Sequence, residues 1–146
     1  MKVELFGSSD ARLERAIALR VAVFVVEQGV PLDEELDAHD TTADPTAIHA
    51  VVCQGERPVG TGRLYFVEPG VARIGRMAVA VEARGRGVGR AILEALMREA
   101  RERGFRRAVL AAQTHAQTFY NKAGFAVVGD EFVEAGIAHV EMARQL

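Results

Sequence analysis

The pattern of apolar and polar positions changes its period several times along the chain, and each change marks an expected element. The apolar residues from Val3 to Phe6 predict a short strand. Apolar residues then recur at every fourth position from Leu13 to Val21, which predicts an amphipathic helix with Asp10 as its N-terminal cap. We expect this helix to end near Gln28-Gly29.

The segment of residues 30–46 has no regular period. It contains two prolines and six acidic side chains, which predicts a surface loop of unusual length. Downstream, apolar runs separated by glycine-containing turns predict the remaining elements. Strands are expected over residues 48–54, 58–67, from residue 71 onward, 108–112, 125–132 and 138–142, and helices from residue 88 to a stop at Gly104 and over residues 115–122.

The order of these elements is β-α-β-β-β-α-β-α-β-β, which predicts a mixed α/β fold. The three strands after the long loop follow one another through short turns, so we expect them to form an antiparallel meander. At 146 residues the chain is of a size for one domain, residues 1–146, and it contains no repeat or linker.

Composition and charge exclude several classes of protein. The chain is 49% hydrophobic and 26% charged with a net charge of −2, which excludes a disordered chain and a generally basic nucleic-acid binder. No apolar run approaches the roughly 18 residues of a bilayer-spanning helix, and no signal segment is recognisable, so we expect a cytoplasmic protein without a membrane partner. The single Cys53 and four scattered histidines predict neither a disulfide nor a metal site.

The run Arg84-Gly85-Arg86-Gly87-Val88-Gly89-Arg90 carries the strongest functional signal. It follows an apolar strand-like stretch and opens the amphipathic helix that begins at residue 88. Glycines allow a positive φ and close backbone approach, so successive N–H groups can converge on phosphate oxygens. The helix adds its positive dipole end, and no Ser, Thr, Asp or Asn stands at its entry to cap the first amides. We interpret the run as a phosphate-binding loop; a solvated turn and an arginine-glycine patch for nucleic acid are the alternatives.

Two motifs in sequence order make the chain recognisable. They are R-x-x-G-x-G at Arg84, Gly87 and Gly89, between a strand and a helix, and A-x-x-F-Y-x-x-x-G-F at Ala116 to Phe125. The chain resembles the GCN5-related N-acetyltransferase (GNAT) family over nearly its whole length. The stretch Val23 to Pro31, the acidic loop and the sequence G-I-A-H-V-E-M near the end resemble the ElaA-like branch. The resemblance implies a central mixed, mostly antiparallel sheet with splayed strands, flanked by helices.

The resemblance also implies acetyl-CoA as cofactor, with coenzyme A as product. It assigns the pyrophosphate to the backbone amides of Arg84, Gly85, Arg86, Gly87, Val88, Gly89 and Arg90. A bulged strand before the loop would expose backbone groups of Met77, Ala78 and Val79 to the pantetheine arm. Tyr120 matches the family tyrosine that protonates the departing sulfur, and the N–H of Val79 matches the oxyanion donor.

No short motif defines the residues that bind the acceptor, the amine that would receive the acetyl group. Our leading hypothesis for the general base is Glu27, at the end of the first helix, followed by His49, Asp40 and Glu35. Carboxylates of the acidic loop would attract a cationic amine, and we expect Arg20, Glu35, Asp40 and His49 on the substrate side. We interpret the other histidines, Cys53 and Phe119 as ordinary surface or core residues.

The primary functional hypothesis is therefore an N-acetyltransferase that acts on a small-molecule or exposed peptide amine by direct attack. The enzyme alternative is an acyl-homoserine-lactone synthase, because Arg20, Phe24, Glu35, Asp37 and Asp40 resemble that family's R-x-x-x-F and E-x-D-x-x-D pattern, although the chain has no tryptophan. A non-catalytic acyl-CoA-sensing module is the third hypothesis. The last strands could also form the edge of a homodimer.

Overall fold

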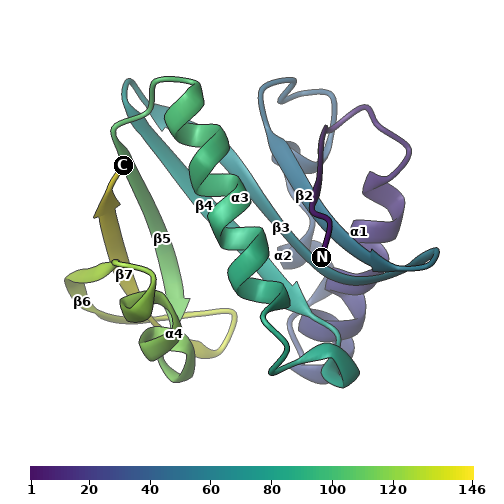
Figure 1. Ribbon diagram of the computed structural model, residues 1–146. Helices are drawn as coiled ribbons and strands as arrows, with labels where there is room; N and C mark the ends of the chain where they lie inside the picture. The colour runs from purple at the N-terminus through teal and green to yellow at the C-terminus, as the bar shows by residue number, and fades with distance from the viewer.

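A computed structural model describes residues 1–146 and contains one seven-stranded sheet with the order β1-β2-β3-β4-β5-β7-β6 (Figure 1). The strands are β1 (Glu4–Gly7), β2 (Ile48–Gln54), β3 (Arg57–Glu68), β4 (Val71–Val79), β5 (Arg107–Gln113), β6 (Ala126–Glu134) and β7 (Ile137–Gln145). The helices are α1 (Leu13–Arg20), α2 (Leu32–Glu35), α3 (Val88–Glu102) and α4 (Gln117–Lys122). The mixed α/β class and the element order expected from the sequence are confirmed, with α2 as an addition.

The first helix and the acidic loop are more structured than their sequence pattern indicates. α1 continues into a π-helical segment, Val21–Glu27, which carries the chain to Gln28 and to Gly29 at φ 76°. The expected cap residue Asp10 lies outside the helix and accepts a hydrogen bond from the Arg12 amide. The loop of residues 30–46 contains α2 and a 3₁₀ turn, Ala38–Asp40, closed by a capping box between Asp37 and Asp40.

The sheet divides at its centre. Strands β2, β3 and β4 form the expected antiparallel meander. β4 and β5 are parallel and pair only at Val71–Arg73 with Arg107–Val109, so they diverge beyond this point. Figure 1 shows β4 and β5 diverging, with α4 near the lower end of β5. Because the parallel pairing stops after three residue pairs, the backbone groups of β4 and β5 that face each other beyond it have no strand partner.

A bulge in β4 lies next to this opening. Thr61 pairs with Ala78 while Arg63 pairs with Gly75, so Arg76 and Met77 together oppose one residue of β3. Arg76 has φ 52°, and an extra residue in this conformation bends a strand. The bulged strand expected before the glycine-arginine run is therefore present.

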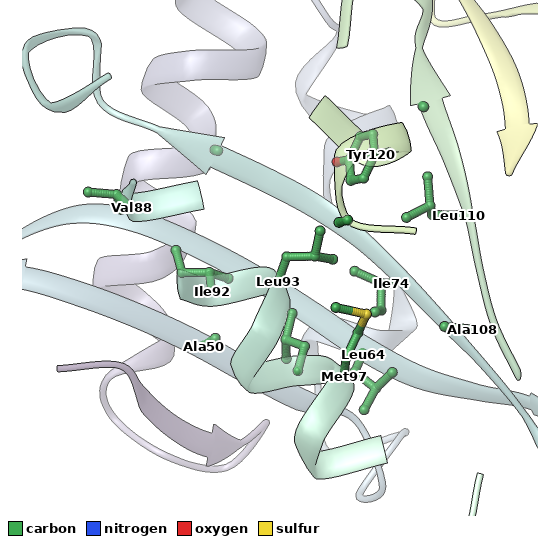
Figure 2. Close-up of a cluster of buried hydrophobic side chains, with 14 of the residues drawn as sticks. Ala50, Leu64, Ile74, Val88, Ile92, Leu93, Met97, Ala108, Leu110 and Tyr120 are labelled. Atoms are coloured by element: carbon green, nitrogen blue, oxygen red, sulfur yellow. The ribbon is translucent and has the colours of Figure 1, made fainter. Parts of the chain in front are cut away.

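The core lies mainly between α3 and the sheet. Ile92, Leu93 and Leu96 of α3 are fully buried against Leu64 of β3 and Ile74 of β4 (Figure 2). α3 approaches β3 closely, because a Cβ on Gly60 would lie 2.4 Å from Val88 Cγ1. α1 packs on the opposite face of the sheet (Figure 1). This close packing holds the start of α3, which directly follows the glycine-arginine run, against β3.

The C-terminal hairpin completes the sheet. β6 and β7 are joined by a turn at Ala135 and Gly136, both with positive φ. β6 is the outer strand and exposes Val127, Val128 and Val133. The homodimer edge expected there stays a prediction. None of the helices has the length and hydrophobicity that crossing a membrane requires.

Candidate active site

Two cavities meet where β4 and β5 diverge. One, of about 820 Å³, is lined by the glycine-arginine run, and we call it the loop cavity. The other, of about 720 Å³, is lined by the β6–β7 hairpin and α2, and we call it the hairpin cavity. Phe24, Met77, Gln113 and Tyr120 line both. A ligand in one cavity can therefore reach a ligand in the other at the Tyr120 side chain.

The loop cavity presents a row of free backbone donors. Gly85 and Gly87 have φ 78° and 82°, and Gly87 is the N-terminal cap of α3 without any side-chain cap. The amides from Gly85 to Arg90 donate to no carbonyl or side chain of the protein. Consecutive unpaired amides at the start of a 15-residue helix form a site for phosphate oxygens. This arrangement fits the pyrophosphate of coenzyme A that the sequence predicts here.

Arg84 fixes the base of this loop. Its Nη1 and Nη2 each lie 2.8 Å from a Glu27 carboxylate oxygen, and its Nε donates to the Val79 carbonyl at 2.9 Å. The side chain thus ties the end of the first helix to the end of β4. Arg90 pairs with Glu94, whereas Arg86 is exposed, forms no ion pair and does not line the loop cavity.

The ion pair with Arg84 argues against Glu27 as the general base. The hydrogen bond from Arg84 lowers the pKa of the Glu27 carboxyl, which makes the carboxylate a weaker proton acceptor. Glu27 also lines the loop cavity and not the hairpin cavity. The structure thus gives Glu27 a positioning role for Arg84.

The edge of β4 borders the loop cavity on its other side. Met77, Ala78 and Val79 all line this cavity, as the sequence predicts. The Val79 carbonyl accepts a hydrogen bond from Arg84 instead of from β3. In an antiparallel ladder the N–H and C=O of one residue point to the same side, so the Val79 amide faces the opening. A donor in this position is suited to an oxyanion or an extended amide-containing chain.

Tyr120 lies at the junction of the two cavities. It projects from α4, packs edge-on against Phe119 and Phe125, and lies near Leu110 of β5 (Figure 2). Its hydroxyl makes no hydrogen bond within the protein and is not sealed from the cavities. Burial raises the pKa of Tyr120 to about 12, so the phenol stays protonated at neutral pH and can act as a proton donor.

The residues predicted to bind the acceptor form a buried ion network instead. Arg20 Nε lies 2.7 Å from Glu35 Oε2, and its Nη1 lies 2.6 Å from Asp40 Oδ1. Arg63 bonds both Asp37 and Asp40, at 2.6 and 3.0 Å. The Arg20 and Asp40 side chains are only 2% and 3% exposed and line neither cavity. The network fastens the acidic loop onto β3, so Arg20 and Asp40 are structural.

Glu35 and His49, which the sequence also predicts on the substrate side, are both engaged by other residues of the protein. Glu35 borders the hairpin cavity, but its carboxylate is held by Arg20 and lies 3.4 Å from Arg76. His49 is buried with Nε2 near the Ser8 hydroxyl and the His39 carbonyl, and it lines neither cavity. Burial lowers the pKa of His49, so the ring is neutral. Neither residue is free to bind or deprotonate an amine.

The hairpin cavity is lined by His139, for which the sequence alone predicts only an ordinary surface or core position. His139 Nδ1 lies 2.7 Å from the Ile137 carbonyl oxygen, and its ring stacks on Phe132. A carbonyl only accepts, so Nδ1 carries the proton and Nε2 carries the lone pair when the ring is neutral. His139 lies directly across the ladder from Gln113, which lines both cavities. His139 lies within the segment G-I-A-H-V-E-M that resembles the ElaA-like branch, and this is the feature of the sequence that points to it.

The fold and the two meeting cavities define an acyltransferase of the acyl-CoA type. The acetyltransferase (GNAT) domain family matches residues 20–146, and the chain belongs to this family. It is 37% identical over 141 residues to the uncharacterized N-acetyltransferase YjcF of Bacillus subtilis, covering 96% of this chain and 97% of YjcF. The crystal structure of Escherichia coli ElaA has a TM-score of 0.86 at 29% identity, covering 98% of each chain. The resemblance to the ElaA-like branch is confirmed, and the chain is an acyltransferase.

The homoserine-lactone alternative receives support only at the level of fold. The synthase BjaI, solved with SAM and isopentyl-CoA, has a TM-score of 0.79 at 18% identity, covering 98% of this chain and 82% of BjaI. Four of the five residues that suggested the alternative, Arg20, Glu35, Asp37 and Asp40, are engaged in the buried ion network. The fifth, Phe24, lines both cavities. The charged part of the pattern therefore has a structural explanation in this fold.

We predict that Asp40→Asn destabilises the protein by about 3 kcal/mol at pH 7, because it leaves Arg20 and Arg63 buried without a shared counter-charge. Burial alone would raise the pKa of Asp40, but the bonds from Arg20 and the charge of Arg63 outweigh it and hold that pKa well below its usual range. Ionised Asp40 therefore stabilises the fold above about pH 4, and this contribution is lost as the pH falls further.

Urea denaturation of the wild type and Asp40→Asn at pH 7 and pH 3 measures both effects. The variant should lose less stability than the wild type between these pH values. Asp130→Asn, on exposed β6, is the matched control and should change stability by less than about 0.5 kcal/mol. Equal stability of Asp40→Asn and the wild type at pH 7 would show that the network does not hold the loop.

Proposed function

We propose that the protein transfers the acetyl group of acetyl-CoA to a primary amine of a small molecule or of an exposed peptide terminus, with both substrates bound together. The observation that carries this proposal is the meeting of the loop cavity and the hairpin cavity at Tyr120. The donor enters the loop cavity, with its pyrophosphate on the amides from Gly85 to Arg90 and its extended arm along Met77 to Val79. The amine enters from the hairpin cavity.

The charge of the hairpin cavity supports a cationic acceptor. Two of its four acidic groups are engaged, since Glu35 pairs with Arg20 and Glu141 lies 2.5 Å from Arg73. Glu34 and Glu134 form no ion pair and are exposed at the rim. Two free carboxylates at the entrance would attract an ammonium group, while the interior offers Phe24 and Phe132 as apolar surface.

Proton transfer requires one donor and one acceptor near the junction. We assign the donor role to Tyr120 and the acceptor role to His139 Nε2, directly or through one water. The ammonium group first loses one proton to solvent and becomes a neutral amine. As the amine nitrogen bonds to the thioester carbon and the carbon–sulfur bond breaks, His139 takes the second proton that the nitrogen loses. Tyr120 gives a proton to the sulfur, and the Val79 amide donates to the carbonyl oxygen as it gains charge. The products are an N-acetyl amide and a free thiol, and solvent restores both side chains.

Tyr120→Phe tests the donor role. In a thiol-release assay with acetyl-CoA and polyamines, amino sugars, aminoglycosides, amino acids and peptide termini, the wild type should turn over at least one class. Loss of the phenol should lower kcat by about 10²-fold or more while the Kd for acetyl-CoA stays nearly constant. Tyr65→Phe is the control for kcat, because Tyr65 lines only the hairpin cavity, where its loss should change KM for the amine and not kcat. Failure of the wild type with every class would favour the acyl-CoA-sensing alternative.

His139→Gln tests the acceptor role. We predict that kcat/KM for the amine falls by about 10²-fold, while the Kd for acetyl-CoA is unchanged. His39→Gln, outside both cavities, is the control and should keep the wild-type kcat/KM. A His139→Gln enzyme with the wild-type kcat/KM would exclude this histidine as the base.

A further inference from the structure

A third cavity of about 490 Å³ lies beside α3 and carries a concentration of positive charge. Its walls come from α3, from the end of α4 with the following turn, and from β7, and we call it the α3–α4 groove. The lining contains one carboxylate, Glu94, and the cationic side chains of Arg90, Arg98, Arg101, Lys122 and Arg144. The whole chain has a net charge of −2, so this concentration is local.

Most of these cations have no counter-charge. Arg90 pairs with Glu94 at 2.9 Å, but no carboxylate lies within ion-pair distance of Arg98, Arg101, Lys122 or Arg144. Arg144 is also held in place, since its Nη1 donates to the Ala123 carbonyl at 2.5 Å. Like charges around one concave surface repel one another and create a positive potential that an anion relieves. The groove therefore has the properties of an anion site.

The position of the groove indicates which anion it receives. Arg90 and Lys122 line both the α3–α4 groove and the loop cavity, so the two are continuous. A coenzyme A molecule whose pyrophosphate lies on the amides from Gly85 to Arg90 has its adenosine beyond them. The ribose of that adenosine carries a 3′-phosphate, which is a separate anionic group a few bonds from the pyrophosphate.

We propose that the α3–α4 groove binds the 3′-phosphate of coenzyme A and makes the protein select coenzyme A over dephospho-coenzyme A. This inference rests on the proposed function, because it takes the loop cavity as the pyrophosphate site. Lys122 is at the boundary of the two cavities, and Arg98 lies on the exposed face of α3 within the groove. Each charged hydrogen bond to the phosphate contributes enough to change affinity about tenfold.

Isothermal titration calorimetry with coenzyme A and dephospho-coenzyme A tests the proposal without any acceptor amine. The two ligands differ only in the 3′-phosphate. The wild type should bind coenzyme A at least about tenfold more tightly, and added salt should reduce this preference. Lys122→Met and Arg98→Met should each reduce the preference for coenzyme A, and Arg98→Met, which lies outside the loop cavity, should leave dephospho-coenzyme A binding unchanged. Arg15→Met, an exposed arginine of α1 that also lacks an ion pair, is the matched control and should retain the wild-type preference.

The outcomes separate this inference from the proposed function. Equal binding of the two ligands by the wild type would overturn the 3′-phosphate site and leave the loop cavity as the pyrophosphate site. A wild-type preference that persists in both Lys122→Met and Arg98→Met would also overturn it, because the phosphate would then lie elsewhere. Binding of neither ligand would contradict the proposed function itself.

Discussion

The early end of the pairing between β4 and β5 determines the rest of this structure. Three residue pairs join the two strands, and beyond Arg73 and Val109 they no longer pair with each other, while β4 stays paired with β3 and β5 with β7. Unpaired backbone groups inside a protein are costly, so the opening has to be held by other contacts or filled by a ligand. Phe24, Met77 and Tyr120 line the two cavities at this opening. The side-chain amides of Gln28 and Gln113 exchange two hydrogen bonds, at 2.8 and 3.3 Å, which tie the end of the first helix to β5. The candidate active site is therefore the region where β4 and β5 are not paired with each other.

Arginines perform three different tasks around this opening. Arg20 and Arg63 are buried and neutralise the acidic loop, which fastens α2 at the entrance of the hairpin cavity. Arg84 is immobilised by Glu27 and the Val79 carbonyl, so it shapes the glycine loop. The cations of the α3–α4 groove are free. Charge that is already paired supports the structure, and charge that is unpaired is available for a ligand.

The structure brings together more of the residues predicted for the acetyl-CoA side than of those predicted for the amine side, and the reason is the range of the contacts. The glycine run and Tyr120 lie in short motifs whose geometry is local, and the structure places them around one cavity. The partner of an arginine is instead decided by tertiary contacts: Arg84 meets Glu27 across 57 positions, and Arg20 meets Asp40 across 20. The acidic composition of the loop alone predicts an attraction for an amine, because the sequence does not show that these carboxylates are paired with arginines. His139 becomes a candidate base only in the folded structure, where the pairing of β7 with β5 places it across from Gln113.

A titration of isotopically labelled protein with coenzyme A, followed by the amide resonances in NMR spectra, tests the central claim most directly. We expect saturable shifts of the amides of Val79 and of residues 85–90, with one common Kd, and little change in β1 and β2. Shifts confined to the β6–β7 hairpin, or loop amides that do not respond at saturating ligand, would contradict the assignment of the opening as the donor site.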